Sequence, residues 1–99
     1  MIMIAGTLRV PTKNMDAARS AIGRLIKETQ KEAGCLDFRF SEDLADAGLL
    51  HMTERWADQA TLDAHRQSDH LKEFRPIGEI LGITERNIFQ YEVTSERKL

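Results

Sequence analysis

The sequence predicts an α+β fold in which four strands and two helical regions follow one another in the order β-α-β-β-α-β. Apolar residues recur at every second position in four segments, as in half-buried strands, and at every third or fourth position in the others, as in amphipathic helices. Residues typical of turns and helix caps separate these segments. The 99 residues fit one domain spanning 1–99, because domains usually contain about 50 to 250 residues.

Composition and charge argue against several classes of protein. The formal charge is −2, from 14 basic and 16 acidic residues. Both signs are interspersed along every expected helix, which argues against a nucleic-acid partner. No apolar run approaches the roughly 18 residues of a membrane span, and the first residues lack the pattern of a signal peptide. The single cysteine, Cys35, cannot form an internal disulfide, so we expect a protein of the reducing cytoplasm.

The first strand and first helix are expected over the N-terminal third. Residues 1–10 alternate, and Pro11 ends the strand because it has no N–H for the sheet. From Asn14, the expected N-cap, the period changes and predicts a helix of about five turns that ends before Gly34. The residues on the apolar face of this helix are Met15, Ala18, Ile22, Leu25, Ile26, Thr29 and Ala33.

A hairpin is expected next. Residues 35–43 and 49–56 both alternate, and the turn residues of 44–48 join them. Because side chains alternate across a strand, the second of these strands has two distinct faces. One carries Leu50, Met52, Glu54 and Trp56, and the other carries Leu49, His51, Thr53 and Arg55.

Two short helices are expected after the hairpin. Asp58 caps the first, which continues to Gln67 and places Leu62 and His65 on one face; Ser68-Asp69 caps the second. Pro76 lies inside the second helix and predicts a kink or break there. Gly82 ends the helical region.

The last segments complete the fold. Residues 83–93 form the fourth strand, with Phe89, Tyr91 and Val93 on one side, and 94–99 are a charged tail that we expect to fray. The order of elements is the split, ferredoxin-like β-α-β-β-α-β arrangement, with a four-stranded antiparallel sheet and helices on one face. The other face carries too many apolar side chains to meet water. We therefore expect a homodimer in which two sheets pack face to face as a dimeric α/β barrel.

Several short motifs together resemble the antibiotic biosynthesis monooxygenase domains, the dimeric α+β barrels that include quinol monooxygenases. The resemblance covers essentially the whole chain. The matching motifs are Glu32-Ala33-Gly34-Cys35-Leu36, Glu54-Arg55-Trp56, Leu62-Asp63-Ala64-His65 and Ser68-Asp69-His70-Leu71-Lys72-Glu73-Phe74.

This resemblance implies oxygenation of polyphenols, anthrones or quinols by O2 without a metal or an organic cofactor. Other relatives bind and degrade haem, or are isomerases. The haem-degrading relatives use an Asn on the first strand and a haem-ligating His in the last helix. Those positions correspond here to Thr7 and Arg75, so the chain departs from the haem pattern.

Oxygenation without a cofactor needs particular groups. O2 is a triplet and reacts with a closed-shell organic molecule only after an electron-rich anion has formed. The enzyme must therefore supply a base, donors that stabilise the anion, and a dry pocket. His65 and His51 are the candidate bases, and Glu54 could orient His65 as an acid–base partner. Alternatively, His65 is a half-buried residue that fixes its helix on the sheet, and Glu54 pairs with Arg55 or Arg75.

The candidate substrate-binding residues also have structural alternatives. Trp56 could form a wall against an aromatic ring, or could simply close the end of the core. Arg39 could hold an anionic substrate, or pair with acidic groups of its own sheet. Phe40, Phe74 and Tyr91 could line a pocket for a flat ring, or could be packing residues.

A metal site is not expected. His65 and His70 are five residues apart, a spacing that one helix does not place on one face. Nucleophile, phosphate-loop and dinucleotide motifs are absent. The sequence thus favours a cofactor-independent monooxygenase acting on a small aromatic, anthrone or quinol. The alternatives are a non-catalytic binding or regulatory barrel, and an acid–base isomerase on the same scaffold.

Overall fold

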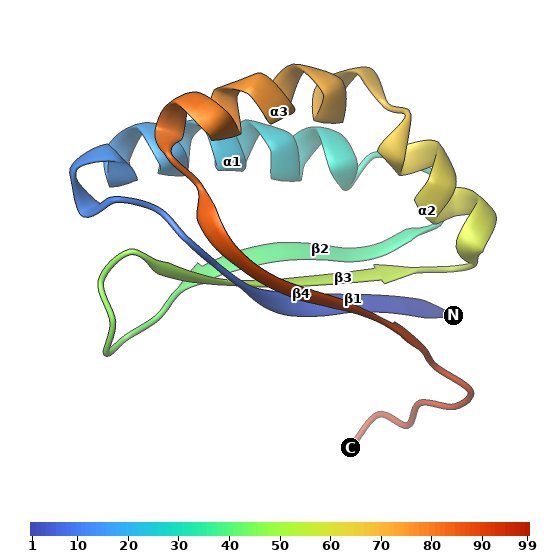
Figure 1. Ribbon diagram of the computed structural model, residues 1–99. Helices are drawn as coiled ribbons and strands as arrows, with labels where there is room; N and C mark the ends of the chain where they lie inside the picture. Colours follow the sequence, from blue (N-terminus) through green and yellow to red (C-terminus); the bar gives the residue numbers. More distant parts are fainter.

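The computed structural model describes residues 1–99 and contains the predicted order of elements (Figure 1). The expected four strands are present, and the second helical region consists of two helices. None of the helices combines the length and the apolar character that a membrane span requires. The elements are β1 (Ile2–Arg9), the 3₁₀ helix η1 (Thr12–Asn14), α1 (Met15–Thr29), β2 (Cys35–Glu42), β3 (Leu49–Trp56), α2 (Gln59–Arg66), α3 (Asp69–Leu81) and β4 (Thr84–Glu92).

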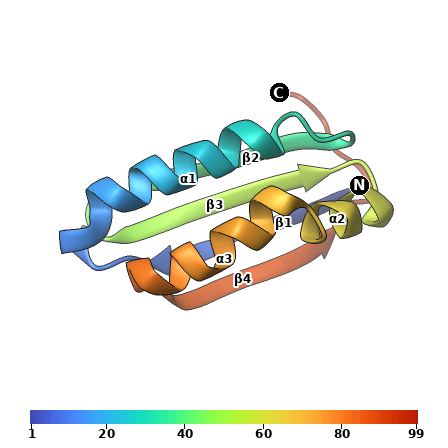
Figure 2. The same cartoon turned by 90° about the horizontal axis from the view of Figure 1, so that it is seen from above.

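The strands form one antiparallel sheet in the order β2-β3-β1-β4. This is the predicted ferredoxin-like topology, in which β1 and β3 are central. All helices lie on one face of the sheet, with α3 running above the β1 and β4 side (Figures 1 and 2). The molecule is only 19 Å thick along its shortest axis, which corresponds to one sheet and one layer of helices.

The hydrophobic core lies between these two layers. Its sixteen buried apolar residues include members of every strand and α-helix except β4, which has no buried residue. The largest side chains without exposed surface are Trp56, Phe38 and Leu62. The core therefore fills the space beneath α1 and α2 more completely than the space beneath α3.

Helix α1 differs from its prediction at both ends. It ends at Thr29, so the expected extension to Ala33 is wrong. Gly34 does have a positive φ of 80°, but it lies in the turn that leads to β2. The side chain of Asn14 does not cap α1; its Nδ2 donates to the carbonyl oxygen of Leu81 at 2.9 Å.

The caps of α2 and α3 agree with the sequence. Asp58 accepts from the N–H of Thr61 in a capping box, and Ser68 accepts from the N–H of Leu71. Gly82 ends α3 in the left-handed region, with φ 79°. The break expected at Pro76 does not occur, because α3 continues through it. Pro76 is on the exposed side of α3, where water can bond the carbonyl that loses its N–H partner.

The face of the sheet opposite the helices is uncovered (Figure 1). Paired residues share a face, so Met3 and Ala5 of β1 lie there beside Tyr91 and Phe89 of β4. Phe89 and Tyr91 are 59% and 51% exposed. Residues 93–99 have no regular secondary structure, and Glu96 among them pairs with Arg55 at 2.6 Å.

Candidate active site

A cavity of about 520 Å³ lies between the sheet and helices α2 and α3. Ten of its sixteen lining residues are hydrophobic, including Phe40 and Phe74. Its volume is in the range of small-molecule sites. Two buried residues with acid–base chemistry, His65 and Glu54, also line it.

His65 is held between aromatic rings. Its relative exposure is 3%, and the ring centroids of Trp56 and Phe38 lie 4.8 and 5.4 Å from that of the imidazole. The side chain projects inward because Leu62, one helical turn earlier, anchors the same face of α2 in the core. This packing fixes the imidazole ring in the lining of the cavity.

Glu32 determines which nitrogen of His65 is free. Its Oε2 lies 2.7 Å from Nδ1 of His65 and 2.9 Å from Nε2 of His70. Because a carboxylate oxygen only accepts hydrogen bonds, both of these ring nitrogens donate to it. Neutral His65 is then protonated on Nδ1, and its Nε2 carries a lone pair.

Nε2 of His65 remains available to a ligand. It makes no hydrogen bond, whereas Nδ1 of the same ring is bonded to Glu32. His65 is among the residues that line the cavity. An imidazole with one nitrogen bonded to a carboxylate and the other free has the arrangement of a general base.

Glu54 lies in the same cavity and is 6% exposed. Its Oε1 accepts a hydrogen bond from Nε1 of Trp56 at 2.9 Å. Burial raises the pKa of Glu54 above its ordinary value, and the hydrogen bond from Trp56 and the proximity of His65 and Arg66 only partly oppose this rise. The cavity thus contains a carboxyl group with a raised pKa and an imidazole that can accept a proton.

The structure brings only some of the predicted site residues together. His65, Glu54, Phe40 and Phe74 line the cavity. Trp56 is fully buried behind His65 and does not line it. The other three predicted residues, His51, Arg39 and Tyr91, lie on the uncovered face of the sheet, away from the cavity.

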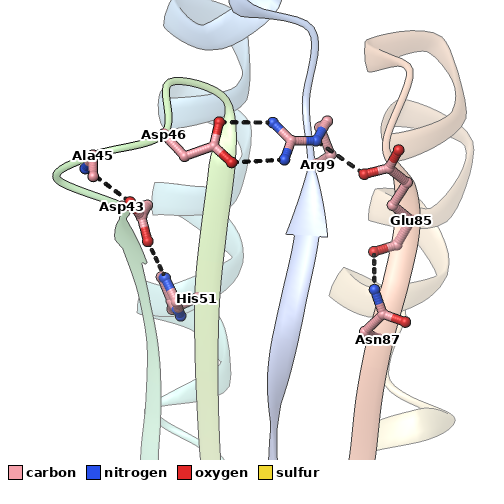
Figure 3. A network of polar contacts seen from close by, with 7 residues as sticks. All are labelled: Arg9, Asp43, Ala45, Asp46, His51, Glu85 and Asn87. Atoms are coloured by element: carbon pink, nitrogen blue, oxygen red, sulfur yellow. Dashed lines mark hydrogen bonds and ion pairs between the residues drawn. The ribbon is translucent and has the colours of Figure 1, made fainter.

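His51 belongs instead to a polar network at the hairpin (Figure 3). Its Nε2 lies 2.8 Å from Oδ2 of Asp43, and this contact lowers the pKa of the Asp43 carboxyl. In the same network Arg9 bonds Asp46 and Glu85, each at 2.9 Å. These contacts tie the β2–β3 turn to β1 and β4. Arg39 likewise pairs with Asp37 at 2.7 Å.

Neither Glu32 nor the role of His70 was predicted from the sequence. The five-residue spacing of His65 and His70 excludes a common face only within one helix. The chain ends α2 at Arg66 and begins α3 at Asp69, so the two histidines converge from different helices. The donor atoms of Glu32, His65 and His70 all lie within 4.8 Å of one another, and two imidazoles with a carboxylate could hold a metal ion. The sequence did contain a signal for this arrangement. The N-cap at Ser68 separates the two helices and so allows His65 and His70 to approach each other from different directions.

The chain is similar to several known proteins. Residues 1–76 match the family described as antibiotic biosynthesis monooxygenase. The chain is 36% identical over 66 residues to "Putative monooxygenase Rv0793" of Mycobacterium tuberculosis. The aligned residues cover 66% of this chain and 64% of that protein. The chain is also 27% identical over 73 residues to "Uncharacterized protein sll1783" of Synechocystis. Here the aligned residues cover 74% of this chain and 50% of that protein. The matches thus span between half and two thirds of these relatives.

A solved structure shares the fold over the whole chain. The crystal structure of "a putative antibiotic biosynthesis monooxygenase from Deinococcus radiodurans" superposes with a TM-score of 0.92 and 24% identity, covering 100% of this chain and 98% of that one. At this identity the likeness shows the fold alone. The match over residues 1–76 covers most of the chain, and it confirms the predicted kinship: the chain belongs to the antibiotic biosynthesis monooxygenase family.

Proposed function

We propose that the protein is a cofactor-independent monooxygenase that oxidises a small aromatic, anthrone or quinol with O2 in the cavity between helices and sheet. One observation carries this proposal above the others. His65 lines a largely apolar cavity and its Nε2 makes no hydrogen bond, while Glu32 holds the opposite nitrogen. Membership of the monooxygenase family supports the same reading.

In the proposed reaction, Nε2 of His65 removes a proton from a hydroxyl or an activated C–H of the bound substrate. Glu32 stabilises the imidazolium that results. The anion then transfers electrons to O2. When an anthrone CH2 becomes a ketone, one oxygen atom enters the product and the other leaves as water, so the substrate supplies every electron. The protein contributes the base and a largely apolar cavity.

Glu54 has a complementary role. Because burial favours its protonated form, it can donate a hydrogen bond to the oxygen on which negative charge develops. Trp56 acts one step further away, since its N–H is directed at Glu54 and its ring packs on His65. We assign Trp56 a positioning role, with Phe40 and Phe74 contacting the substrate ring.

Oxygen consumption tests the proposal. We expect substrate-dependent O2 uptake with at least one member of a panel of anthrones and quinols, and persistence of that uptake after treatment with EDTA. His65→Gln should lower turnover at least 100-fold, the size of a general-base contribution. His51→Gln should retain turnover because His51 lies on the opposite face of the sheet. Equal loss in both variants, or loss on chelation with recovery on adding Zn²⁺, would contradict this assignment.

An acid–base isomerase is the second candidate. The observation that favours it is the presence of a proton acceptor, His65, and a protonation-prone acid, Glu54, in one cavity. These two groups could move a proton within a substrate without consuming oxygen. Turnover of the same compounds under strictly anaerobic conditions would identify this activity.

We further propose that two copies pair through the uncovered face of the sheet in the cytoplasm. Exposed Phe89 and Tyr91, beside Met3 and Ala5, provide an apolar strip along β1 and β4. An isologous contact through this strip would give the dimeric barrel expected from the sequence. The single Cys35 suits a reducing compartment, since no internal disulfide is possible.

A further inference from the structure

Three arginines from three different elements line the cavity: Arg66 at the end of α2, Arg75 in α3 and Arg86 in β4. None of them forms an ion pair. Most of the chain's other arginines do, namely Arg9, Arg19, Arg39 and Arg55. Unpaired guanidinium groups gathered at one cavity are therefore a distinctive feature of this side of the molecule.

Their existing contacts leave most donors free. Arg66 Nη2 donates to Oε1 of Gln90 at 3.3 Å, Arg75 Nη2 to the carbonyl of Arg66 at 3.2 Å, and Arg86 Nη1 to the carbonyl of Ile83 at 3.4 Å. Each acceptor is neutral and each distance is long for a hydrogen bond. A guanidinium has five N–H donors, so each arginine retains capacity for a second partner.

The acidic groups nearby do not neutralise this charge. Glu54 also lines the cavity but forms no ion pair with any of the three arginines; burial raises its pKa, and the proximity of Arg66 partly opposes that rise. Glu79 borders an adjoining depression with Arg75 and Arg86, and neither arginine bonds it. Three arginines and one carboxyl group therefore leave the lining of the cavity net positive, while most of its lining residues are hydrophobic.

We propose that the substrate is an aromatic carboxylate, whose ring occupies the apolar interior and whose carboxylate binds Arg66, Arg75 and Arg86. A planar guanidinium suits a carboxylate because two N–H groups can bond its two oxygens. A ligand anion would also relieve the mutual repulsion of the three cations. This inference rests on the proposed function, since it names the substrate class of the same cavity.

Binding of two matched probes tests the inference. 1-Hydroxy-2-naphthoate and 1-hydroxy-2-naphthamide share a ring system and differ in charge, and isothermal titration calorimetry without oxygen measures both. We expect the carboxylate to bind roughly 10-fold more tightly at low salt, from charge-assisted hydrogen bonds at a partly exposed rim. The preference should shrink as salt is raised, because screening weakens exposed ion pairs.

Substitutions of the arginines test whether these residues cause the preference for the carboxylate. Arg66→Gln/Arg86→Gln should bind the amide as the unchanged protein does but lose the preference for the carboxylate, and the corresponding lysine variants should recover part of it. Arg24→Gln is the matched control, because Arg24 is an unpaired, exposed arginine of α1 that does not line this cavity. Circular dichroism checks that each variant is folded.

The outcomes are decisive. Equal binding of both probes, no binding of either at millimolar concentration, or an equal effect of Arg24→Gln would overturn the inference. The same experiments distinguish a failure of this inference from a failure of the proposed function. If the carboxylate preference is intact but no hydroxyaryl carboxylate supports O2 uptake, the anion site stands and the monooxygenase assignment falls. If O2 uptake occurs with neutral substrates only, the monooxygenase stands and the anion site falls.

Discussion

Glu32 connects the turn after α1 to helices α2 and α3 through a single oxygen atom. That oxygen accepts from both His65 and His70, so the carboxylate orients the proposed base and also joins three segments. A residue that acts through another group should affect the rate more than binding.

Glu32→Gln tests this role. Gln keeps the size of the side chain but lacks the negative charge that stabilises the imidazolium of His65. We expect kcat to fall roughly 10- to 100-fold, the range seen when a residue that orients a catalytic or ligand histidine is changed, with KM nearly unchanged. Steady-state O2 uptake measures both constants. A rise in KM with kcat intact would contradict a positioning role.

Glu54 gives a prediction about pH and stability. Its folded-state pKa is raised by burial above the ordinary value of 4.5, so the folded state binds its proton more tightly than the unfolded state does. The stability that this proton confers is complete below pH 4.5 and is lost as pH rises through the folded-state pKa.

Glu54→Gln removes this dependence while keeping an oxygen that can accept from Trp56. The free energy of unfolding of the variant, relative to the unchanged protein, should therefore increase between pH 4 and pH 7. Urea unfolding followed by far-ultraviolet circular dichroism at several pH values provides the comparison. A difference that is constant with pH would show that Glu54 titrates alike in both states.

At the scale of elements, the contact of β1 with β4 depends on Gly6. A Cβ atom there would lie 2.0 Å from the carbonyl oxygen of Asn87 and 2.6 Å from Cα of Ile88. Both are backbone atoms, which cannot move without shifting β4. At Gly23, in the middle of α1, no atom beyond the chain neighbours and the backbone of the same helix lies within 4 Å of the corresponding position.

The two glycines should therefore respond in opposite directions to alanine. Gly6→Ala should lower the free energy of unfolding by roughly 1–3 kcal/mol through overpacking. Gly23→Ala should raise it by about 0.5–1 kcal/mol, because alanine is the better helix residue. Thermal and urea unfolding measure both. Equal effects would mean that β4 adjusts freely.

The elements were predictable where local patterns determine them. β3 has its predicted bounds, 49–56, because alternation, a turn and Trp56 all delimit it. The apolar pattern of α1 continues to Ala33, so the sequence alone could not show that the helix ends at Thr29.

The site was less predictable because it depends on distant residues. The inward position of His65 followed from its spacing to Leu62, but Glu32 is 33 residues away from it. Alternation already placed His51 opposite Glu54. A single pocket could not contain His51 and Glu54, because their side chains project from opposite faces of β3.

The shape of the whole molecule makes self-association testable. The protein is thin, and its uncovered sheet face includes exposed Phe89 and Tyr91. Sedimentation equilibrium should give twice the chain mass of 11.3 kDa at micromolar concentration. Phe89→Asp should shift the protein to monomers, because a charge would be buried in the apolar contact.

Leu44→Asp is the control for this change. Leu44 is also an exposed large apolar residue, but it lies in the turn between β2 and β3, outside the strip of β1 and β4. The dimer should survive in this variant. A monomer in the unchanged protein at 10–100 µM, or dissociation by both variants, would remove the proposed pairing.

The contact between the rings of Trp56 and His65 gives the protein an intrinsic optical reporter. The chain has one tryptophan, and its ring centroid lies 4.8 Å from that of His65. An imidazolium accepts an electron from an excited indole far better than a neutral imidazole does, so indole emission should dim whenever His65 gains a proton. Stopped-flow fluorimetry could therefore follow proton transfer to His65 during a single turnover, without any attached dye.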